Sequence, residues 1–128
     1  MEDSLFNGVE ILIAEDNLDN YTLLKEFTWL IGVKHIWAKN GLEALDILTN
    51  HENISLILMD INMPEMDGIT ATRIIRERKI GIPIIFQTAC IVEENREECI
   101  NAGGNDFLCK PFNNGELRLV LNKYLTKD

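Results

Sequence analysis

The sequence alternates five times between a short apolar run and a longer segment with helical periodicity. The apolar runs are Glu10–Ala14, His35–Ala38, Ile54–Met59, Ile82–Gln87 and Asp106–Cys109. Three of them contain nearly continuous apolar stretches (ILIA, ISLILM and IPIIF), which are typical of strands covered on both faces, as in parallel sheets. The alternation therefore predicts an α/β fold, a doubly wound parallel sheet of five strands with five helices.

The segments that follow these runs carry apolar residues at the three- and four-residue spacing of a helix. Their first apolar positions are Leu23, Leu42, Ile69, Val92 and Leu117. Gly32 follows the first segment and Gly103-Gly104 follows the fourth. Glycine at these places predicts that two of the helices end there.

The composition fits one globular domain that spans residues 1–128. The length suits a single core, and 46% apolar with 26% charged residues excludes a disordered, collagen-like or coiled-coil chain. A net charge of −9 disfavours binding to phosphate backbones, so we expect no direct contact with nucleic acid. No apolar run approaches the roughly 18 residues of a membrane span. The N-terminus lacks the basic start of a signal peptide. We therefore expect a cytoplasmic domain without membrane contact of its own, whether or not its parent chain is anchored.

Several other residue types carry only structural expectations. Cys90, Cys99 and Cys109 lack the C-x-x-C spacing, so we expect small buried side chains in a reducing compartment. His35 and His51 have no partner at metal-ligand spacing, which predicts structural or exposed positions. Trp29 and Trp37 are expected to contribute to packing.

Polar residues follow four of the five predicted strands. Glu15 and Asp16 follow the first, Asp60 follows the third, Thr88 the fourth and Lys110 the fifth. Ligands of such sheets bind beyond the carboxyl ends of the strands. The sequence therefore predicts that three carboxylates, one hydroxyl and one ammonium group converge at this edge.

These residue types suit the transfer of a phosphoryl group. Crowded carboxylates repel one another unless a cation lies among them, and hard oxygen ligands suit Mg²⁺. Asp60 can act as a nucleophile that forms an aspartyl-phosphate, while Lys110 and Thr88 meet other phosphoryl oxygens. Taken singly, Asp16 and Asn17 would be helix-capping residues and Asp60 a turn residue. The expected convergence of all these polar residues at one edge of the sheet favours the functional interpretation.

Four stretches resemble the receiver domains of two-component response regulators, and the resemblance covers nearly all of the chain. They are IAEDN (13–17), LILMDINMPEMDG (56–68), PIIFQTA (83–89) and AGGNDFLCKPF (102–112). The combination is similar above all to receivers attached to hybrid histidine kinases. The resemblance implies a flavodoxin-like fold with the strand order 2-1-3-4-5.

The resemblance also implies roles for individual residues. Asp60 corresponds to the phosphoacceptor and Lys110 to the phosphoryl-binding lysine. Asp16 corresponds to a direct Mg²⁺ ligand, Glu15 to a ligand acting through water, and the backbone carbonyl of Asn62 completes the metal shell.

The resemblance further implies a conformational switch. Thr88 corresponds to the switch hydroxyl and Phe107 to the aromatic rotamer switch, in a family where the Lys110–Pro111 bond is usually cis. This chain has Phe where the family more often has Tyr, and Gln87 where an apolar residue is more usual. The implied output is the surface made by the fourth helix, fifth strand and fifth helix.

The implied partners are a histidine kinase, a histidine phosphotransfer domain, or both. The chain is then the receiver portion of a hybrid sensor histidine kinase, with no output domain of its own. The alternative is a stand-alone single-domain regulator that acts by binding a partner, and whether the parent chain is an enzyme is left open. A haloacid dehalogenase-type phosphatase is disfavoured because Asp60-x-Asn62 is on the third strand, not the first. A degenerate receiver, which would never be phosphorylated, is disfavoured because each expected active-site position holds a residue of the type that the reaction needs.

Overall fold

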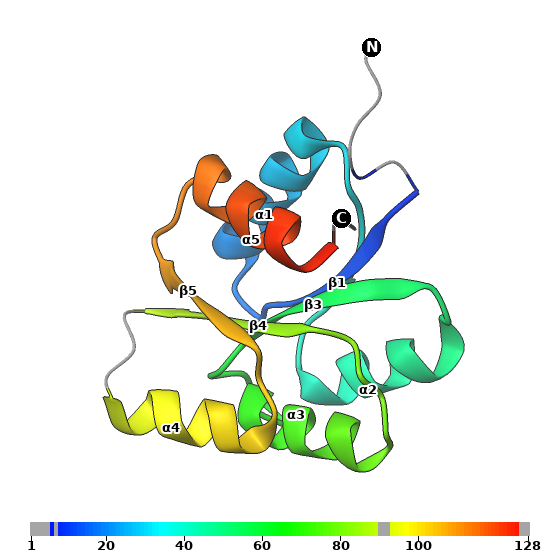
Figure 1. Cartoon of the computed structure of the whole chain (residues 1–128), viewed down its shortest axis with the longest axis vertical. Coiled ribbons are helices and arrows are strands. Elements are labelled where there is room, and N and C mark those ends of the chain that lie inside the picture. The colour runs from blue at the N-terminus through cyan, green and yellow to red at the C-terminus, as the bar shows by residue number, and fades with distance from the viewer. Residues whose placement is uncertain (1–5, 7, 90–92, 126–128) are drawn as a thin grey trace.

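The computed structural model describes residue 6, residues 8–89 and residues 93–125, without the side chains of residues 93–95. It confirms the predicted α/β fold as a five-stranded parallel sheet in the order β2-β1-β3-β4-β5 (Figure 1). The strands are β1 (Glu10–Ala14), β2 (Lys34–Ala38), β3 (Ile54–Asp60), β4 (Ile84–Ala89) and β5 (Asp106–Lys110). The helices are α1 (Leu18–Ile31), α2 (Gly41–Asn50), α3 (Gly68–Glu77), α4 (Glu93–Ala102) and α5 (Asn114–Leu125).

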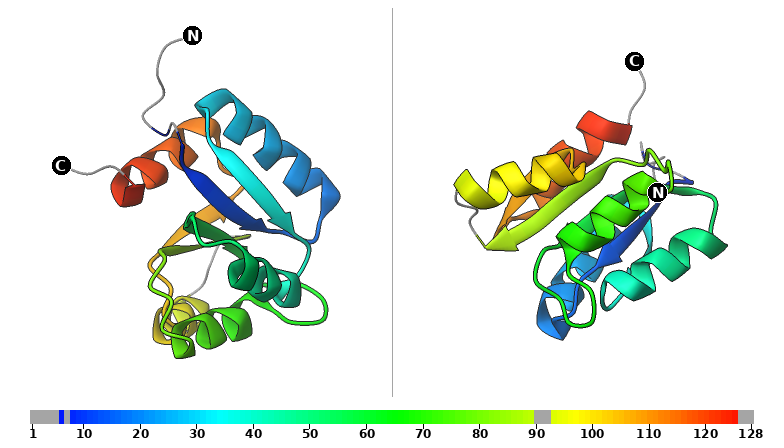
Figure 2. Two further views of the ribbon diagram at one scale, coloured as in Figure 1. Left: turned by 90° about the vertical axis from the view of Figure 1, so that its right-hand side faces the viewer. Right: turned by 90° about the horizontal axis from the view of Figure 1, so that it is seen from below.

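The helices cover the sheet as two layers. Helices α1 and α5 lie on one face, and α2, α3 and α4 lie on the other (Figures 1 and 2). Each face has its own core: Ile13 and Leu58 pack towards α1 and α5, whereas Leu12 and Met59 pack towards α2 and α3. Because successive strand residues point to opposite faces, strands buried on both sides must be apolar throughout.

Three strands end later in the chain than the sequence pattern predicts. β3 includes Asp60, which pairs with Gln87, and β5 includes Lys110, which pairs with Ala89. β4 covers 84–89 instead of 82–87, so Thr88 lies inside this strand and not after it. The strands include these polar residues because their backbone groups still pair with the neighbouring strands.

Helix termini follow the local chemistry of the chain. Asn17 caps α1, since its side chain accepts a hydrogen bond from the Asn20 N–H at 2.9 Å. Gly32 ends the same helix at φ 90°, and its N–H bonds to the Thr28 carbonyl. Asp67 caps α3 by accepting from the Thr70 N–H at 2.7 Å. None of the helices within the described part of the chain is long and apolar enough to cross a bilayer.

Two packing predictions are wrong. Cys109 is exposed: it lies on the edge strand β5 and points away from the core that holds its neighbour Leu108. Trp29 is 78% exposed. The buried side of α1 carries its neighbour Thr28, so the next residue along the helix points away from the sheet. Cys99 is buried, as predicted, whereas Cys90 lies outside the described residues.

The predictions for Trp37 and the two histidines are confirmed. Trp37 packs by stacking on Tyr21, with ring centroids 3.8 Å apart. His35 is half-buried and lies within hydrogen-bond distance of the Tyr21 hydroxyl at 2.8 Å, and His51 is exposed.

Candidate functional site

The charged residues predicted to converge do meet at the carboxyl ends of the strands. Glu15 and Asp16 directly follow β1, while Asp60 ends β3 and Lys110 ends β5. Lys110 Nζ lies 2.8 Å from Glu15 Oε1 and 3.6 Å from Asp60 Oδ2. One carboxylate oxygen from each of Glu15, Asp16 and Asp60 lies within 4.8 Å of the others. Four charged groups from three strand ends therefore share one small volume.

Glu15 is held by contacts on both carboxylate oxygens. Its side chain is fully buried, Oε1 accepts from Lys110, and Oε2 accepts from the Asn17 backbone N–H at 3.1 Å. The Trp37 indole N–H donates to the Glu15 backbone carbonyl at 2.8 Å. These bonds compensate for the burial of the Glu15 charge and fix the residue at the floor of the site.

Asp60 has the electrostatics of a carboxylate crowded by others. Burial and the neighbouring Glu15 raise the pKa of Asp60 to about 7, against the opposing influence of Lys110. A buried carboxyl beside a second carboxylate resists ionisation because no full counter-charge compensates both. A cation among these oxygens would favour the ionised form that a nucleophile needs.

Asp16 differs from both of these residues because it is exposed. Of the two residues that could cap α1, Asn17 is the cap and Asp16 is not. Its carboxylate has no hydrogen-bond partner among the residues that the structure describes. Three carboxylates, two buried and one exposed, form the kind of oxygen-rich set that holds a hard cation such as Mg²⁺.

The connection from β3 to α3 shapes one wall of the site. Gly68 lies so close to Asp60 that a Cβ at this position would overlap the Asp60 carbonyl oxygen. The Gly68 N–H bonds to the Ile61 carbonyl at 2.8 Å and closes the loop. Asn62 is exposed within this loop, two residues after Asp60, on a polar cavity of about 280 Å³ that Thr88 also lines.

Thr88 and Phe107 lie on the face of the sheet covered by α3 and α4. Thr88 is buried and pairs in register with Cys109. Phe107 is half-buried against Phe86, with ring centroids 6.3 Å apart, and the Arg96 guanidinium lies 4.6 Å above its ring. The Lys110–Pro111 peptide bond is cis, as the resemblance implies.

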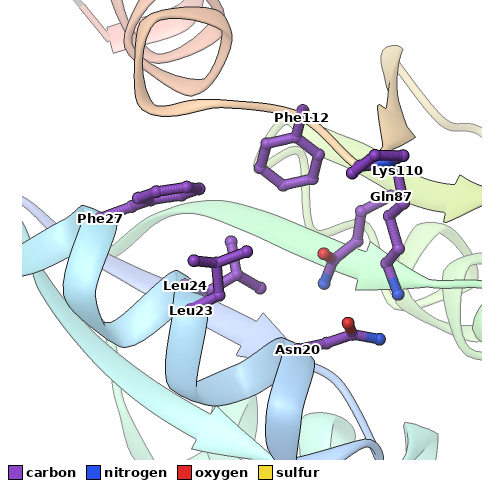
Figure 3. Close-up of a pocket in the computed structure, with 8 residues that line it drawn as sticks. Asn20, Leu23, Leu24, Phe27, Gln87, Lys110 and Phe112 are labelled. Atoms are coloured by element: carbon purple, nitrogen blue, oxygen red, sulfur yellow. The ribbon is translucent and has the colours of Figure 1, made fainter.

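The sequence singled out Gln87 as unusual but did not predict a role for it. This residue lines a cavity of about 270 Å³ between α1 and the β5–α5 connection, next to Lys110 (Figure 3). The only sequence signal is an amide within an otherwise apolar stretch, PIIFQTA.

Comparison with known proteins identifies the family. Residues 11–122 match the family model of the response regulator receiver domain. The chain belongs to this family. It is a receiver domain of two-component and phosphorelay signalling, closely related to the receivers of hybrid histidine kinases.

Two curated relatives show how the receiver domain compares with whole proteins. It is 35% identical over 130 residues to the osmosensing histidine protein kinase SLN1 of Saccharomyces cerevisiae, and the match covers 96% of the chain but only 11% of SLN1. It is 37% identical over 112 residues to two-component response regulator 24 of Arabidopsis thaliana, a match that covers 88% of the chain and 81% of that protein.

Solved structures agree with this fold. The receiver domain of sensor histidine kinase PA1611 from Pseudomonas aeruginosa, with magnesium in its active site cleft, superposes with a TM-score of 0.83 at 36% identity. That match covers 91% of this chain and 96% of the other. A structure of the Saccharomyces cerevisiae phosphotransfer protein Ypd1 with the receiver domain of Ssk1 gives a TM-score of 0.84 at 30% identity, over 93% and 90% of the two chains.

Proposed function

We propose that this receiver domain accepts a phosphoryl group from a phosphohistidine onto Asp60 and depends on Mg²⁺ to do so. The observation that carries the proposal is the placement of Lys110 Nζ 3.6 Å from the Asp60 carboxylate, beside the carboxylates of Glu15 and Asp16. A carboxylate nucleophile flanked by one ammonium group and further metal-binding oxygens suits the charge of a transferring phosphoryl group.

The reaction forms one bond and breaks one. An oxygen of Asp60 attacks phosphorus as the bond between phosphorus and the histidine nitrogen breaks, and the imidazole leaves with the electron pair of that bond. Lys110 compensates charge on one phosphoryl oxygen, and the Thr88 hydroxyl donates to another. Bound Mg²⁺ supplies further charge neutralisation.

Exposure and pairing support the proposed assignment of the metal ligands. Asp16, which is exposed and not engaged as a cap, would be a direct ligand together with Asp60 and the Asn62 backbone carbonyl. Glu15 would act through water, because Lys110 and the Asn17 N–H already occupy its oxygens. The magnesium in the PA1611 receiver supports this choice of metal.

Phosphorylation then changes the surface formed by α4, β5 and α5. Thr88 and Phe107 lie on the sheet face next to α4, where a shift of the Thr88 side chain can alter the packing of the Phe107 ring. New charge and acceptor oxygens at Asp60 supply the local event that drives such a switch.

The phosphodonor is a histidine kinase or a histidine phosphotransfer protein. The Ssk1 receiver, solved with Ypd1, supports the second type of partner. The parent protein is a hybrid sensor histidine kinase, and the alternative is a stand-alone regulator similar in extent to Arabidopsis response regulator 24. The domain works in the cytoplasm and binds no nucleic acid directly, in keeping with its net charge of −9.

Labelling with a small phosphodonor tests the proposal. Acetyl phosphate with Mg²⁺ should add one phosphoryl group to the wild-type domain, as measured by intact-protein mass spectrometry, and EDTA should prevent it. Asp60→Asn should abolish the addition, whereas Asp46→Asn, at an exposed aspartate of α2, should retain it. Stoichiometric labelling of the Asp60→Asn variant would show that the acceptor is another residue.

A further inference from the structure

Trp37 lies on the edge strand β2, yet its side chain reaches the turn that carries two of the proposed metal-binding carboxylates. The indole Nε1–H donates to the backbone carbonyl of Glu15 at 2.8 Å. Strands β1 and β2 are adjacent and parallel, and both run beside α1 (Figure 2). Trp37 is half-buried, and the proposed phosphoryl transfer assigns it no part.

The Glu15 carbonyl belongs to the peptide group that joins Glu15 to Asp16. A peptide group is planar, so a hydrogen bond that fixes its carbonyl oxygen also fixes the direction in which the chain continues to the Asp16 Cα atom. The N–H of Glu15 donates to the Ala38 carbonyl at 2.9 Å. The end of β2 therefore holds both backbone polar groups of Glu15, one through a backbone carbonyl and one through an indole.

The Asp16 carboxylate depends on this backbone placement more than the Glu15 carboxylate does. Glu15 is held through its own side chain, by Lys110 and by the Asn17 N–H. The Asp16 carboxylate is exposed, and none of the side chains that the structure describes forms a hydrogen bond with it. Its position is therefore set by the backbone that carries it, and a ligand that is already in place loses less conformational freedom on binding.

The Trp37 ring is itself held by contacts with α1. It stacks on Tyr21, with the ring centroids 3.8 Å apart and an angle of 3° between the rings. The Tyr21 hydroxyl lies 2.8 Å from His35 Nε2, and His35 Nδ1 lies 3.1 Å from the Thr28 hydroxyl oxygen. These contacts alternate between α1 and β2, so the indole N–H has its direction before any metal binds.

We propose that Trp37 is a positioning residue for the metal site: its indole N–H orients the Glu15–Asp16 peptide group and thereby preorganises the Asp16 carboxylate for Mg²⁺. Tyr21 acts one step further from the metal, by orienting the indole through stacking. The inference rests on the proposed function, which makes Asp16 a metal ligand. Groups that hold metal ligands in place contribute to metal affinity although they do not touch the metal.

Removal of the indole N–H alone tests the proposal. Trp37→Phe keeps an aromatic ring that can stack on Tyr21, and it should weaken Mg²⁺ binding by about three- to tenfold, as expected for one lost hydrogen bond. Trp29→Phe makes the same chemical change at an exposed indole and should leave the affinity unchanged. Mg²⁺ titrations followed by the Asn17 amide NMR signal measure both affinities, since this N–H bonds to Glu15 Oε2. Equal affinities for the two variants would overturn the proposal.

The Mg²⁺ dependence of labelling by acetyl phosphate separates positioning from a general loss of structure. Excess metal can still bring a misplaced ligand into position. Trp37→Phe should therefore need about three- to tenfold more Mg²⁺ for half-maximal labelling, with a rate at saturating Mg²⁺ within about twofold of the wild type. A lower rate at saturating Mg²⁺ with an unchanged Mg²⁺ requirement would show a structural defect and contradict the proposal.

Tyr21 provides a second test in a background that retains the indole. Tyr21→Phe keeps the stacked ring and should bind Mg²⁺ within about twofold of the wild type, whereas Tyr21→Leu removes the stacking and should weaken binding further than that. Added to Trp37→Phe, Tyr21→Leu should cause no further loss, because its effect passes through the indole N–H. Equal losses for Tyr21→Phe and Tyr21→Leu, or full additivity with Trp37→Phe, would contradict this order of contacts.

The outcomes distinguish this inference from the proposed function. If the wild-type domain binds Mg²⁺ but acetyl phosphate does not label it, the proposed phosphoryl transfer fails, and the Mg²⁺ titrations still decide the inference. If labelling occurs and the Mg²⁺ affinities of Trp37→Phe and Trp29→Phe agree, only the inference is overturned. A wild-type domain that binds no Mg²⁺ would overturn the inference together with the metal requirement of the proposed function.

Discussion

At the scale of single residues, the carboxyl of Asp60 links the site to the stability of the domain. Without metal, burial and Glu15 raise the pKa of Asp60 to about 7 in the folded state. The unfolded carboxyl ionises near its ordinary value of about 3.9. Between these two values the unfolded chain releases a proton that the folded domain retains. The folded domain therefore loses stability as the pH rises through this window, and the loss levels off above about pH 7.

Asp60→Asn should remove this loss. In EDTA we expect the variant to melt above the wild type by about 5 °C or more at pH 7.5, and by clearly less at pH 4.5. Scanning calorimetry at both pH values provides the measurement, and Asp46→Asn controls for the removal of one exposed carboxylate. A difference in melting temperature that does not change with pH would contradict the prediction.

The three carboxylates should contribute unequally to metal binding. Asp16 is exposed and available as a ligand, whereas Glu15 is buried and bonded to Lys110 and the Asn17 N–H. Replacement of a residue in the outer shell of a metal typically costs about tenfold in affinity. We expect Glu15→Gln to weaken Mg²⁺ binding by about this factor, and Asp16→Ala to weaken it considerably more.

Trp37 provides the signal for this measurement because its indole N–H bonds to the Glu15 carbonyl. Trp29 is exposed, and Trp29→Phe removes its background emission. Mg²⁺ titrations of both variants in this background give the two affinities. Equal losses for Asp16→Ala and Glu15→Gln would refute the assignment of Asp16 as the direct ligand.

At the scale of elements, Arg76 joins segments that lie far apart in the chain. Its Nη1 donates to the carbonyls of Ile80 and Ile82 at 2.7 and 2.9 Å, in the α3–β4 connection. Nε donates to the Gly103 carbonyl at 3.0 Å and Nη2 to Asn105 Oδ1 at 2.8 Å, in the α4–β5 connection. One guanidinium group thereby positions the start of both β4 and β5.

Arg76→Met should destabilise the domain by about 2 to 4 kcal/mol, because its acceptors lose their donors together. Arg76→Lys should recover only part of this, since an ammonium lacks the planar fork of donors. Urea unfolding measures the effect. Arg78→Met, at an exposed residue that ends α3, should stay within about 0.5 kcal/mol of the wild type. Similar losses for the Arg76→Met and Arg78→Met variants would mean that the network contributes little.

At the scale of the whole molecule, the two proposed switch residues share one face of the sheet. Thr88 and Phe107 lie on the α4 side, where Phe107 is half-buried between Phe86 and Arg96. A phenylalanine has no hydroxyl to desolvate, so an inward position of this ring costs less than that of a tyrosine. We therefore expect the unphosphorylated domain already to populate inward and outward rings.

Phosphorylation, or a beryllofluoride mimic of it, should shift this population. Aromatic ¹³C NMR of Phe107 measures the shift, with the fully buried Phe86 ring as an internal control. Thr88→Ala should still permit phosphorylation of Asp60 but should abolish the change at Phe107. A single ring position in both states would show that Phe107 is a packing residue and that the signal leaves by another route.

The sequence by itself determined the class of fold and which charged residues meet at one edge of the sheet. Five apolar runs with helical segments between them can bury both faces of a strand only in a covered parallel sheet. Polar residues directly after or at the end of these runs must then share one edge, which is why Asp60 and Lys110 meet although 50 positions separate them. Capping follows local chemistry, and Gly32 ended α1 as predicted.

Only the tertiary structure decided the features that depend on distant partners. The ends of β3, β4 and β5 are set by neighbouring strands, and the exposure of Cys109 and Trp29 depends on which helix covers which face. The pairing of Glu15 with Lys110 and the cavity at Gln87 arise where α1 meets the β5–α5 connection. Periodicity specifies which side of an element is apolar, but burial depends on what packs against that side, and this is a property of the assembled fold.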